Sequence, residues 1–227
     1  MEKLLIKLYF NNLESIEQIY NKKYSHISLE EFYELLCKNI FETDCSMILK
    51  EIDFESNRKL INSKTIPQFS QFSHGSFELI KILSSVDFLE FNYISLGKIF
   101  LENNKNDGAY RKYGENHVKL ASLLGYVTFS KSFNFKINSY GVFINELDAN
   151  FRDNINRKNI LRIPIVSHIL KEASFKEVSI YEILKKSSDL SESTIKRRAS
   201  SIKTLLKEVQ KLNDISIAEA IGRIYEL

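Results

Sequence analysis

Cationic and hydroxyl side chains alternate with apolar ones between Leu190 and Leu206, where the sequence is LSESTIKRRASSIKTLL. The apolar residues recur at helical spacing and predict one buried face, made of Ile195, Ala199, Ile202 and Leu206. The opposite face suits a nucleic acid, because lysines and hydroxyls bind phosphates and arginine forks pair with guanine edges. The alternative is an amphipathic helix whose basic face is only solvated. The expected DNA contacts are Ser193, Lys196, Arg197, Ser200 and Lys203.

A second set of candidate DNA contacts lies upstream, in a helix expected over Ala109–Leu124 and closed by Gly125. Arginine can read guanine, asparagine can read adenine, and lysine binds phosphate. The candidates are Arg111, Lys112, Asn116 and Lys119 on the helix and Lys131 in the hairpin that follows. Because glycine inside a helix costs about 1 kcal/mol relative to alanine, Gly114 favours a kink or a later start of this helix.

Catalytic and metal-binding motifs are not found. No lysine has Asp or Glu two positions before it, so the common restriction-type nuclease motif is absent. His117 and Lys119 have the spacing of an HxK motif, but its other residues are missing, and His117 is expected near the core edge or on a phosphate. The four histidines lack zinc-ligand spacing, and there is no P-loop or dinucleotide motif. We therefore predict no catalytic residue, no metal and no cofactor. A binding protein is favoured over an enzyme, which would have to be a site-specific DNA endonuclease.

The elements that would position both sets of side chains follow a repeated order. The segment from residue 75 predicts a helix, an extended piece at Tyr93–Ile94, two helices, two short strands and a last helix, which is the order of a winged helix. A similar order follows residue 160, without an obvious wing. The polar segment Asn150–Asn159 is interpreted as an interdomain joint. The predicted fold is mainly α with small β-hairpin wings: a helical N-terminal region at 1–66, then tandem winged-helix or helix-turn-helix domains at 75–150 and 160–227.

Charge is distributed unevenly along the chain. Residues 1–60 carry 8 Lys/Arg and 11 Asp/Glu, whereas residues 151–211 carry 14 and 7, a net charge of +7. A positive field confined to one region is typical of a nucleic-acid footprint. The acidic residues 1–60, where Ser28 and Glu31 form a capping-box pattern, could dock a protein partner or form a homodimer.

Composition favours a helical protein of the cytoplasm. The 227 residues include only 2 Pro and 7 Gly, and 44% are hydrophobic, enough for real cores. Cys37 and Cys45 have neither zinc nor disulfide spacing and are expected to be reduced and partly buried. No apolar run has transmembrane length and no signal-peptide pattern is present, so no membrane contact is expected.

The segment Gly108–Val127, the hairpin after it and Asn138–Phe143 resemble winged-helix modules of restriction-modification proteins. The recognition regions of type IIS restriction endonucleases are similar in layout: a helix ending in a leucine-glycine turn, a hairpin, and a pattern around a glycine. Leu190–Arg198 resembles the helix with serine, threonine and a double arginine that closes such regions. The resemblance covers about residues 75–210 and implies site-specific recognition of duplex DNA. Since the nuclease motif is missing, it implies a recognition subunit, a regulator, or a module whose catalytic partner is another chain.

These observations predict a bacterial, sequence-specific double-stranded DNA-binding protein. It would be a recognition or regulatory component of a restriction-modification or phage-defence system, or act in transcriptional control. One alternative is a protein-interaction adaptor whose winged helices pack on a partner enzyme. The other is a nuclease or plasmid-type replication initiator with an unrecognised site.

Overall fold

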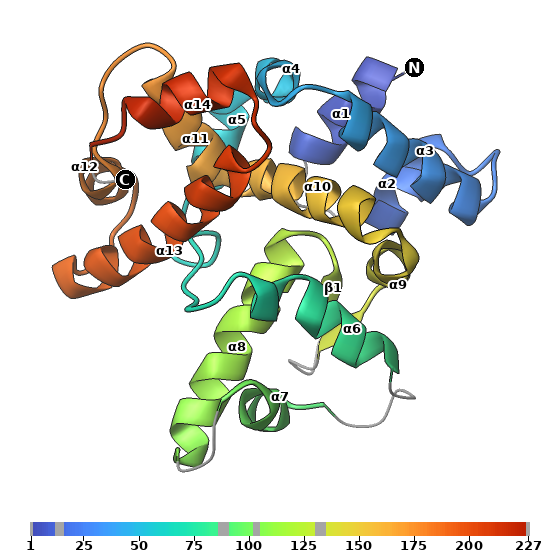
Figure 1. Cartoon of the computed structure of the whole chain (residues 1–227), viewed down its shortest axis with the longest axis horizontal. Coiled ribbons are helices and arrows are strands. Elements are labelled where there is room, and N and C mark those ends of the chain that lie inside the picture. Colours follow the sequence, from blue (N-terminus) through green and yellow to red (C-terminus); the bar gives the residue numbers. More distant parts are fainter. Residues whose placement is uncertain (1, 12–15, 86–90, 102–104, 130–134, 226–227) are drawn as a thin grey trace. The chain divides into compact units, whose positions relative to one another are not determined.

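Helices dominate the computed structural model, which describes residues 2–11, 16–85, 91–101, 105–129 and 135–225 (Figure 1). Helices, 14 of them α-helices, make up 72% of the described residues, and the described strands form one antiparallel hairpin. The prediction of a mainly α protein with a small hairpin is thereby confirmed. Contacts divide the chain into two compact units: residues 1–66 with 149–227, called the first unit, and residues 67–148, called the second unit.

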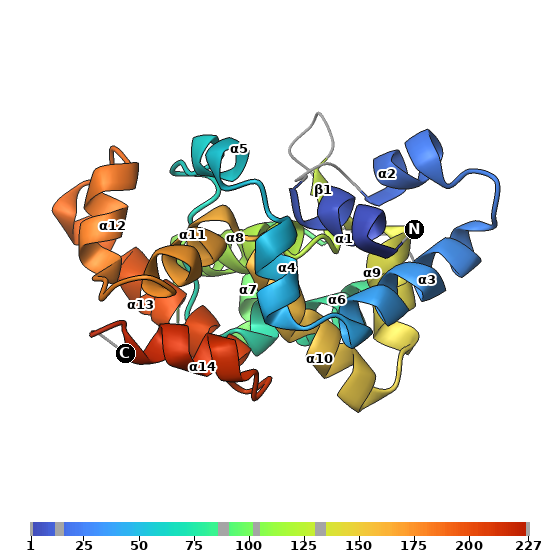
Figure 2. The same ribbon diagram turned by 90° about the horizontal axis from the view of Figure 1, so that it is seen from above.

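The first unit combines the N-terminal and C-terminal thirds of the chain. Its helices are α1 (Glu2–Asn11), α2 (Ile16–Lys23), α3 (Leu29–Glu42), α4 (Cys45–Glu51), α5 (Phe54–Lys59), α10 (Ala149–Asn159), α11 (Pro164–Ala173), α12 (Ile180–Ser187), α13 (Glu192–Gln210) and α14 (Ile215–Gly222), with a short 3-10 helix at Ile160–Arg162. Figures 1 and 2 show α11, α12, α13 and α14 close together, and contacts join α13 to each of the other three.

Local signals fix the start of α3. The Ser28 hydroxyl accepts from the Glu31 amide, and the Glu31 carboxylate accepts from the Ser28 amide at 2.8 Å. This is the capping box expected from the sequence, and it satisfies two amides that a helix start leaves unpaired. The same hydrogen bonds lower the pKa of Glu31.

The polar segment interpreted as an interdomain joint is instead the helix α10, so that prediction was wrong. Three of its polar side chains, those of Asn156, Lys158 and Asn159, are buried. Lys158 is 6% exposed, and its ammonium donates to the carbonyls of Ile40, Phe41 and Thr43 at 3.0, 2.6 and 2.8 Å, which caps the end of α3. Asn159 accepts from the Tyr9 hydroxyl at 2.9 Å. A buried polar group is tolerated when it is hydrogen-bonded, so α10 is an internal helix despite its composition.

The second unit contains a short 3-10 helix at Ser73–Gly75 and the elements α6 (Phe77–Ser85), α7 (Tyr93–Phe100), α8 (Asp107–Leu123), β1 (Val127–Phe129), β2 (Phe135–Ile137) and α9 (Ser139–Glu146). In the hairpin, Val127 pairs with Ile137 and Phe129 with Phe135. The extended piece expected at Tyr93–Ile94 is the first turn of α7. The helix begins there because the Asn92 side chain accepts from the amides of Ile94 and Ser95.

A pair of glycines lets α7 and α8 approach closely. A Cβ added to Gly114 would lie 2.1 Å from the Tyr93 carbonyl oxygen, and one added to Gly97 would lie 2.1 Å from the Tyr110 carbonyl oxygen. Each glycine thus makes room for the backbone of the other helix. The expected kink or late start of α8 at Gly114 was wrong, since α8 runs without interruption from Asp107 and Gly114 serves the packing.

Two further predictions from the sequence concern the cysteines and membrane-spanning helices. Cys37 and Cys45 are free and buried, and burial raises the pKa of the Cys45 thiol to about 12. Within the described residues, every helix is too short or too polar to cross a bilayer.

Candidate nucleic-acid interface

Helix α13 has the two faces that its sequence predicts. Ile195, Ala199, Ile202 and Leu206 are all buried, with exposures between 0% and 8%. The opposite face is open: Ser193, Lys196, Arg197 and Ser200 are exposed, and Lys203 is partly exposed. All five predicted DNA contacts of this helix therefore lie on its solvent-facing side.

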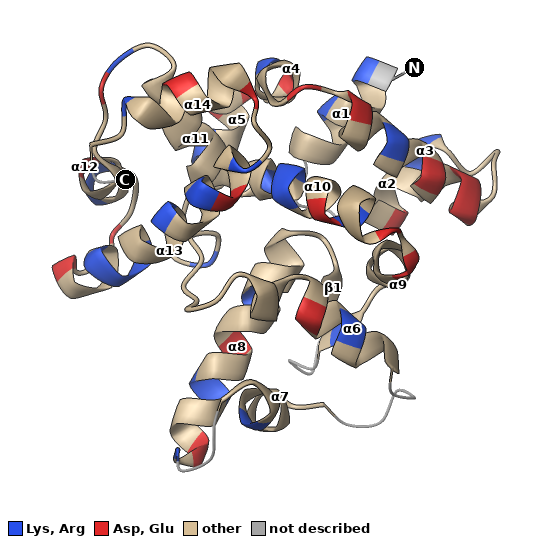
Figure 3. Cartoon of the chain, in the orientation of Figure 1, with Lys and Arg blue, Asp and Glu red and all other residues tan. Residues whose placement is uncertain are grey.

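The cationic side chains of α13 are regularly spaced along that side. Lys196, Ser200, Lys203 and Lys207 follow one another at intervals of four, three and four residues, so they form a row along the helix. Lys207 extends the predicted set by a further turn, and the same 3.6-residue period could have identified it. Figure 3 shows cationic segments spaced along α13. We call Ser193, Lys196, Arg197, Ser200, Lys203 and Lys207 the basic face of α13.

The contacts of the basic face leave its charges available. Lys196 pairs with Glu192 at 3.3 Å, but both side chains are 69% exposed, and such a pair contributes little. Arg197 donates to the Ser193 carbonyl at 3.4 Å and to the Thr194 hydroxyl at 3.2 Å. Within the described residues, Lys203 and Lys207 have no ion pair or hydrogen bond from their side chains. These cations can therefore turn toward phosphates at small cost.

Arg198, next to Arg197, has a different role that the sequence did not reveal. Its guanidinium donates to the carbonyls of Ser63 and Ile66 at 2.5 and 2.6 Å, which ties the segment after α5 to α13. Burial, followed by the nearby charge of Arg197, lowers the pKa of Arg198. Of the two adjacent arginines, one holds the fold together and the other faces solvent.

Helix α12 packs against α13, and both of its own ends are closed by hydroxyl hydrogen bonds. Helix α12 buries Ile180 and Leu184 completely, and its start is capped by the Ser179 hydroxyl, which accepts from the Glu182 amide at 3.2 Å. The four residues 188–191 separate α12 from α13. A hydrogen bond of 2.7 Å from the Ser188 hydroxyl to the Leu184 carbonyl closes α12 at this turn. Two helices joined by three or four residues can present the second to a DNA groove.

Helix α8 of the second unit presents a weaker basic surface. Arg111, Lys112 and Lys119 are exposed and Asn116 is half-buried, so the predicted residues reach solvent to different extents. Glu115 lies among them, 3.8 Å from the Lys112 ammonium and in an ion pair with that of Lys119. Burial by itself would raise the pKa of Glu115. The hydrogen bond and charge of Lys119, with the charges of Lys112 and Arg111, outweigh burial and lower this pKa. The net positive charge of this face is therefore smaller than that of α13.

Within the described residues, the hairpin after α8 contributes one cationic side chain. Lys136 on β2 is exposed, and Phe129 on β1 is 46% exposed. Lys131, predicted as a DNA contact at the tip of the hairpin, lies outside the described residues.

His117 does not belong to the exposed face of α8. It is 1% exposed, and its Nδ1 donates to the Tyr113 carbonyl at 2.8 Å. The rings of His117 and Tyr113 are 4.2 Å apart, and the Nδ1 of His74 lies 2.8 Å from the Tyr113 hydroxyl. Burial lowers the pKa of His117 to about 4, and the nearby His74 acts in the same direction. His117 is therefore a neutral core residue near pH 7. Of the two positions expected for it, the core holds and the phosphate contact does not.

In the part of the chain that the structure describes, no three His, Cys, Asp or Glu side chains are grouped to hold a metal ion. No protein-family model, curated protein or solved structure matches the chain.

Proposed function

We propose that this chain is a sequence-specific double-stranded DNA-binding protein and that the basic face of α13 is its main contact. The observation that carries the proposal is the division of α13 into a buried apolar side and an open side with four cations and two serine hydroxyls. In this proposal Lys196, Lys203 and Lys207 bind phosphates, and Arg197 reaches a base edge.

The order of elements supports two DNA-binding modules. In the first unit, α12, a four-residue turn and α13 have the order of a helix-turn-helix. In the second unit, α6, α7, α8 and the hairpin have the order of a winged helix, with α8 in the place of the recognition helix. Arg111, Lys112, Asn116 and Lys119 would contact DNA from α8.

The biological setting follows from the resemblance to type IIS recognition regions. We propose a recognition or regulatory component of a bacterial restriction-modification or phage-defence system. Since the chain lacks the restriction-type motif, cleavage would fall to a separate catalytic chain. The acidic residues 1–60 would dock that chain or a second copy.

The test is the salt dependence of duplex affinity. Each phosphate contact changes the slope of log K against log salt by about 0.9 on B-DNA. A variant with Lys196, Lys203 and Lys207 changed to Gln should therefore lower the magnitude of the slope by about 2–3. The matched control changes Lys23, Lys38 and Lys50, which are exposed on α2, α3 and α4, to Gln. Equal slopes for the two triple variants would contradict the proposed interface.

A protein-interaction adaptor is the second candidate. Two large apolar side chains of the first unit are open to a partner, since Phe175 is 76% and Ile215 is 77% exposed. Exposed apolar groups of this kind are typical of partner contacts when they are grouped. Duplex affinity that is absent at low salt would favour this candidate over DNA binding.

A further inference from the structure

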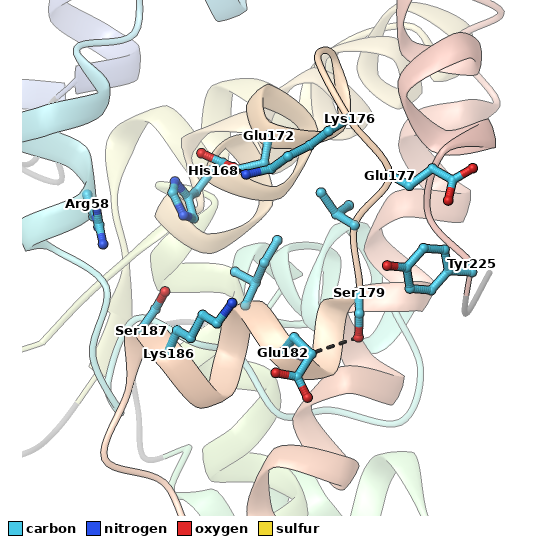
Figure 4. A pocket seen from close by; sticks show the side chains of 12 residues that line it. Arg58, His168, Glu172, Lys176, Glu177, Ser179, Glu182, Lys186, Ser187 and Tyr225 are labelled. Atoms are coloured by element: carbon cyan, nitrogen blue, oxygen red, sulfur yellow. Dashed lines mark hydrogen bonds and ion pairs between the residues drawn. The ribbon is translucent and has the colours of Figure 1, made fainter.

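A cleft of 410 Å³ lies in the first unit beside the helix-turn-helix elements. Its walls come from α5, α11, α12, the segment between α11 and α12, and Tyr225 after α14 (Figure 4). The volume is within the range of about 300–1,000 Å³ of small-molecule sites. Apart from the Tyr225 ring, only two apolar side chains, Val178 and Ile183, contribute to the lining, so the cleft favours a polar ligand.

Cations and carboxylates both line the cleft. Arg58 and Lys186 lie on one side with His168, and Glu177 and Tyr225 lie on the other (Figure 4). Glu182 lies beside Lys186 on α12 (Figure 4). Glu172 pairs with Lys176 at 2.6 Å, so these two lining residues neutralise each other.

The remaining charged side chains of the lining are exposed to solvent. Within the described residues, Arg58, Lys186 and Glu177 make no ion pair, and neither does the Glu182 carboxylate. The Glu182 amide, by contrast, is held by the Ser179 hydroxyl. Two cations and two carboxylates thus line one cleft without a direct ion pair, while the pKa of Glu172, lowered by its hydrogen bond with Lys176, is lowered further by the charge of Arg58. Ionised groups form the strongest hydrogen bonds with a ligand of opposite charge.

We propose that this cleft binds a small dipolar molecule, with its carboxylate or phosphate between Arg58 and Lys186 and its N–H donors toward Glu177 and Glu182. Free amino acids and nucleoside monophosphates share this chemistry. An amino acid would place its ammonium at the carboxylates, whereas a nucleotide would place its base there and stack on the exposed Tyr225 ring.

The position of the cleft indicates a regulatory role, which rests on the proposed function. Helix α12 lines the cleft with Glu182 and Lys186, while its buried Ile180 and Leu184 lie on the side that packs with α13. A ligand that ties α12 to α5 and α11 would therefore change how firmly α13 is held. The molecule is inferred to act as an effector of DNA affinity.

Binding is tested first without DNA, so that the result does not depend on the proposed function. The standard L-amino acids and ribonucleoside monophosphates are screened by thermal shift, with inorganic phosphate as a separate probe. At about ten times its Kd, a genuine ligand should raise Tm by about 3 °C or more. A rise in Tm with an amino acid or with a nucleotide identifies which of the two classes binds. A rise with inorganic phosphate alone, or no rise with any compound, would contradict a dipolar ligand.

Variants then locate the site. Lys186→Gln and Arg58→Gln should each weaken binding by about tenfold or more, because each removes a charged hydrogen bond. Lys185→Gln and Lys59→Gln are the matched controls, since both residues are exposed neighbours that do not line the cleft. Equal affinities for the site and control variants would overturn the site.

The effector role is tested last, by duplex affinity with and without the ligand found. A change that Arg58→Gln abolishes supports the role, and unchanged affinity overturns it. If the chain bound no duplex at all, the proposed function would fail, while the thermal shifts and the variants would still decide whether the cleft is a binding site.

Discussion

Replacing Gly114 with alanine tests the close packing that positions α8. An ordinary helix-interior glycine gains about 1 kcal/mol when it becomes alanine. At Gly114 the new Cβ would lie 2.1 Å from the Tyr93 carbonyl oxygen, against an ordinary contact of 3.4–4 Å. The helices would have to separate by more than 1 Å. Such overpacking costs about 1–3 kcal/mol, or more where the obstacle is backbone. We expect a net destabilisation of about 2 kcal/mol.

Thermal unfolding followed by circular dichroism measures this effect. For a chain of this size, about 2 kcal/mol corresponds to a fall in Tm of about 4–8 °C. Gly222→Ala is the matched control, because nothing lies within 4 Å of a Cβ there and Gly222 is also helical. If Gly114→Ala were as stable as the wild type or more stable, the close approach of α7 and α8 would be refuted.

Three further predictions concern buried or adjacent charged groups. The pKa of His117 is about 4 in the folded chain against 6.5 for a free histidine, so the unfolded state binds more protons between these values. Stability should therefore fall by about 3 kcal/mol as pH drops from about 6.5 to about 4, and His117→Asn should flatten urea-unfolding stability in that window. An unchanged pH slope would contradict the burial of the ring. Lys158→Met should lower the free energy of unfolding by about 3 kcal/mol, because three carbonyls at the end of α3 lose a charged donor. A decrease below about 1 kcal/mol would show that this capping is unimportant. Arg198→Ala should destabilise the fold by about 1–2 kcal/mol, because it removes the hydrogen bonds to Ser63 and Ile66. Arg197→Ala should change stability by less than about 0.5 kcal/mol and should weaken DNA binding. A larger loss of stability in Arg197→Ala than in Arg198→Ala would disprove the assigned roles.

Features set by local periodicity could be predicted from the sequence. The buried face of α13 was predicted because Ile195, Ala199, Ile202 and Leu206 follow the helical repeat, and the same repeat placed the cations outside. The capping box at the start of α3 and the turn at Gly125, whose φ of 94° suits glycine, depend only on neighbouring residues. In these cases the local rule and the tertiary structure agree.

Features set by distant partners could not be predicted. Helix α10 was mistaken for a joint because the carbonyls that bind Lys158 are more than 100 residues away. Arg198 looks like Arg197 in the sequence, and only the segment at Ser63 and Ile66 distinguishes them. Gly114 reads as a helix breaker until the backbone of Tyr93 is placed against it. In each case tertiary packing outweighs the local preference.

The basic face of α13 is proposed to recognise a specific duplex sequence. Selection of the purified full chain against a randomised duplex library, at low and at physiological salt with magnesium present, tests it most directly. We expect one motif to be enriched at both salt concentrations, no cut ends at that motif, and loss of enrichment in Arg197→Ala. Recovery of no motif together with no salt-sensitive binding would contradict the claim.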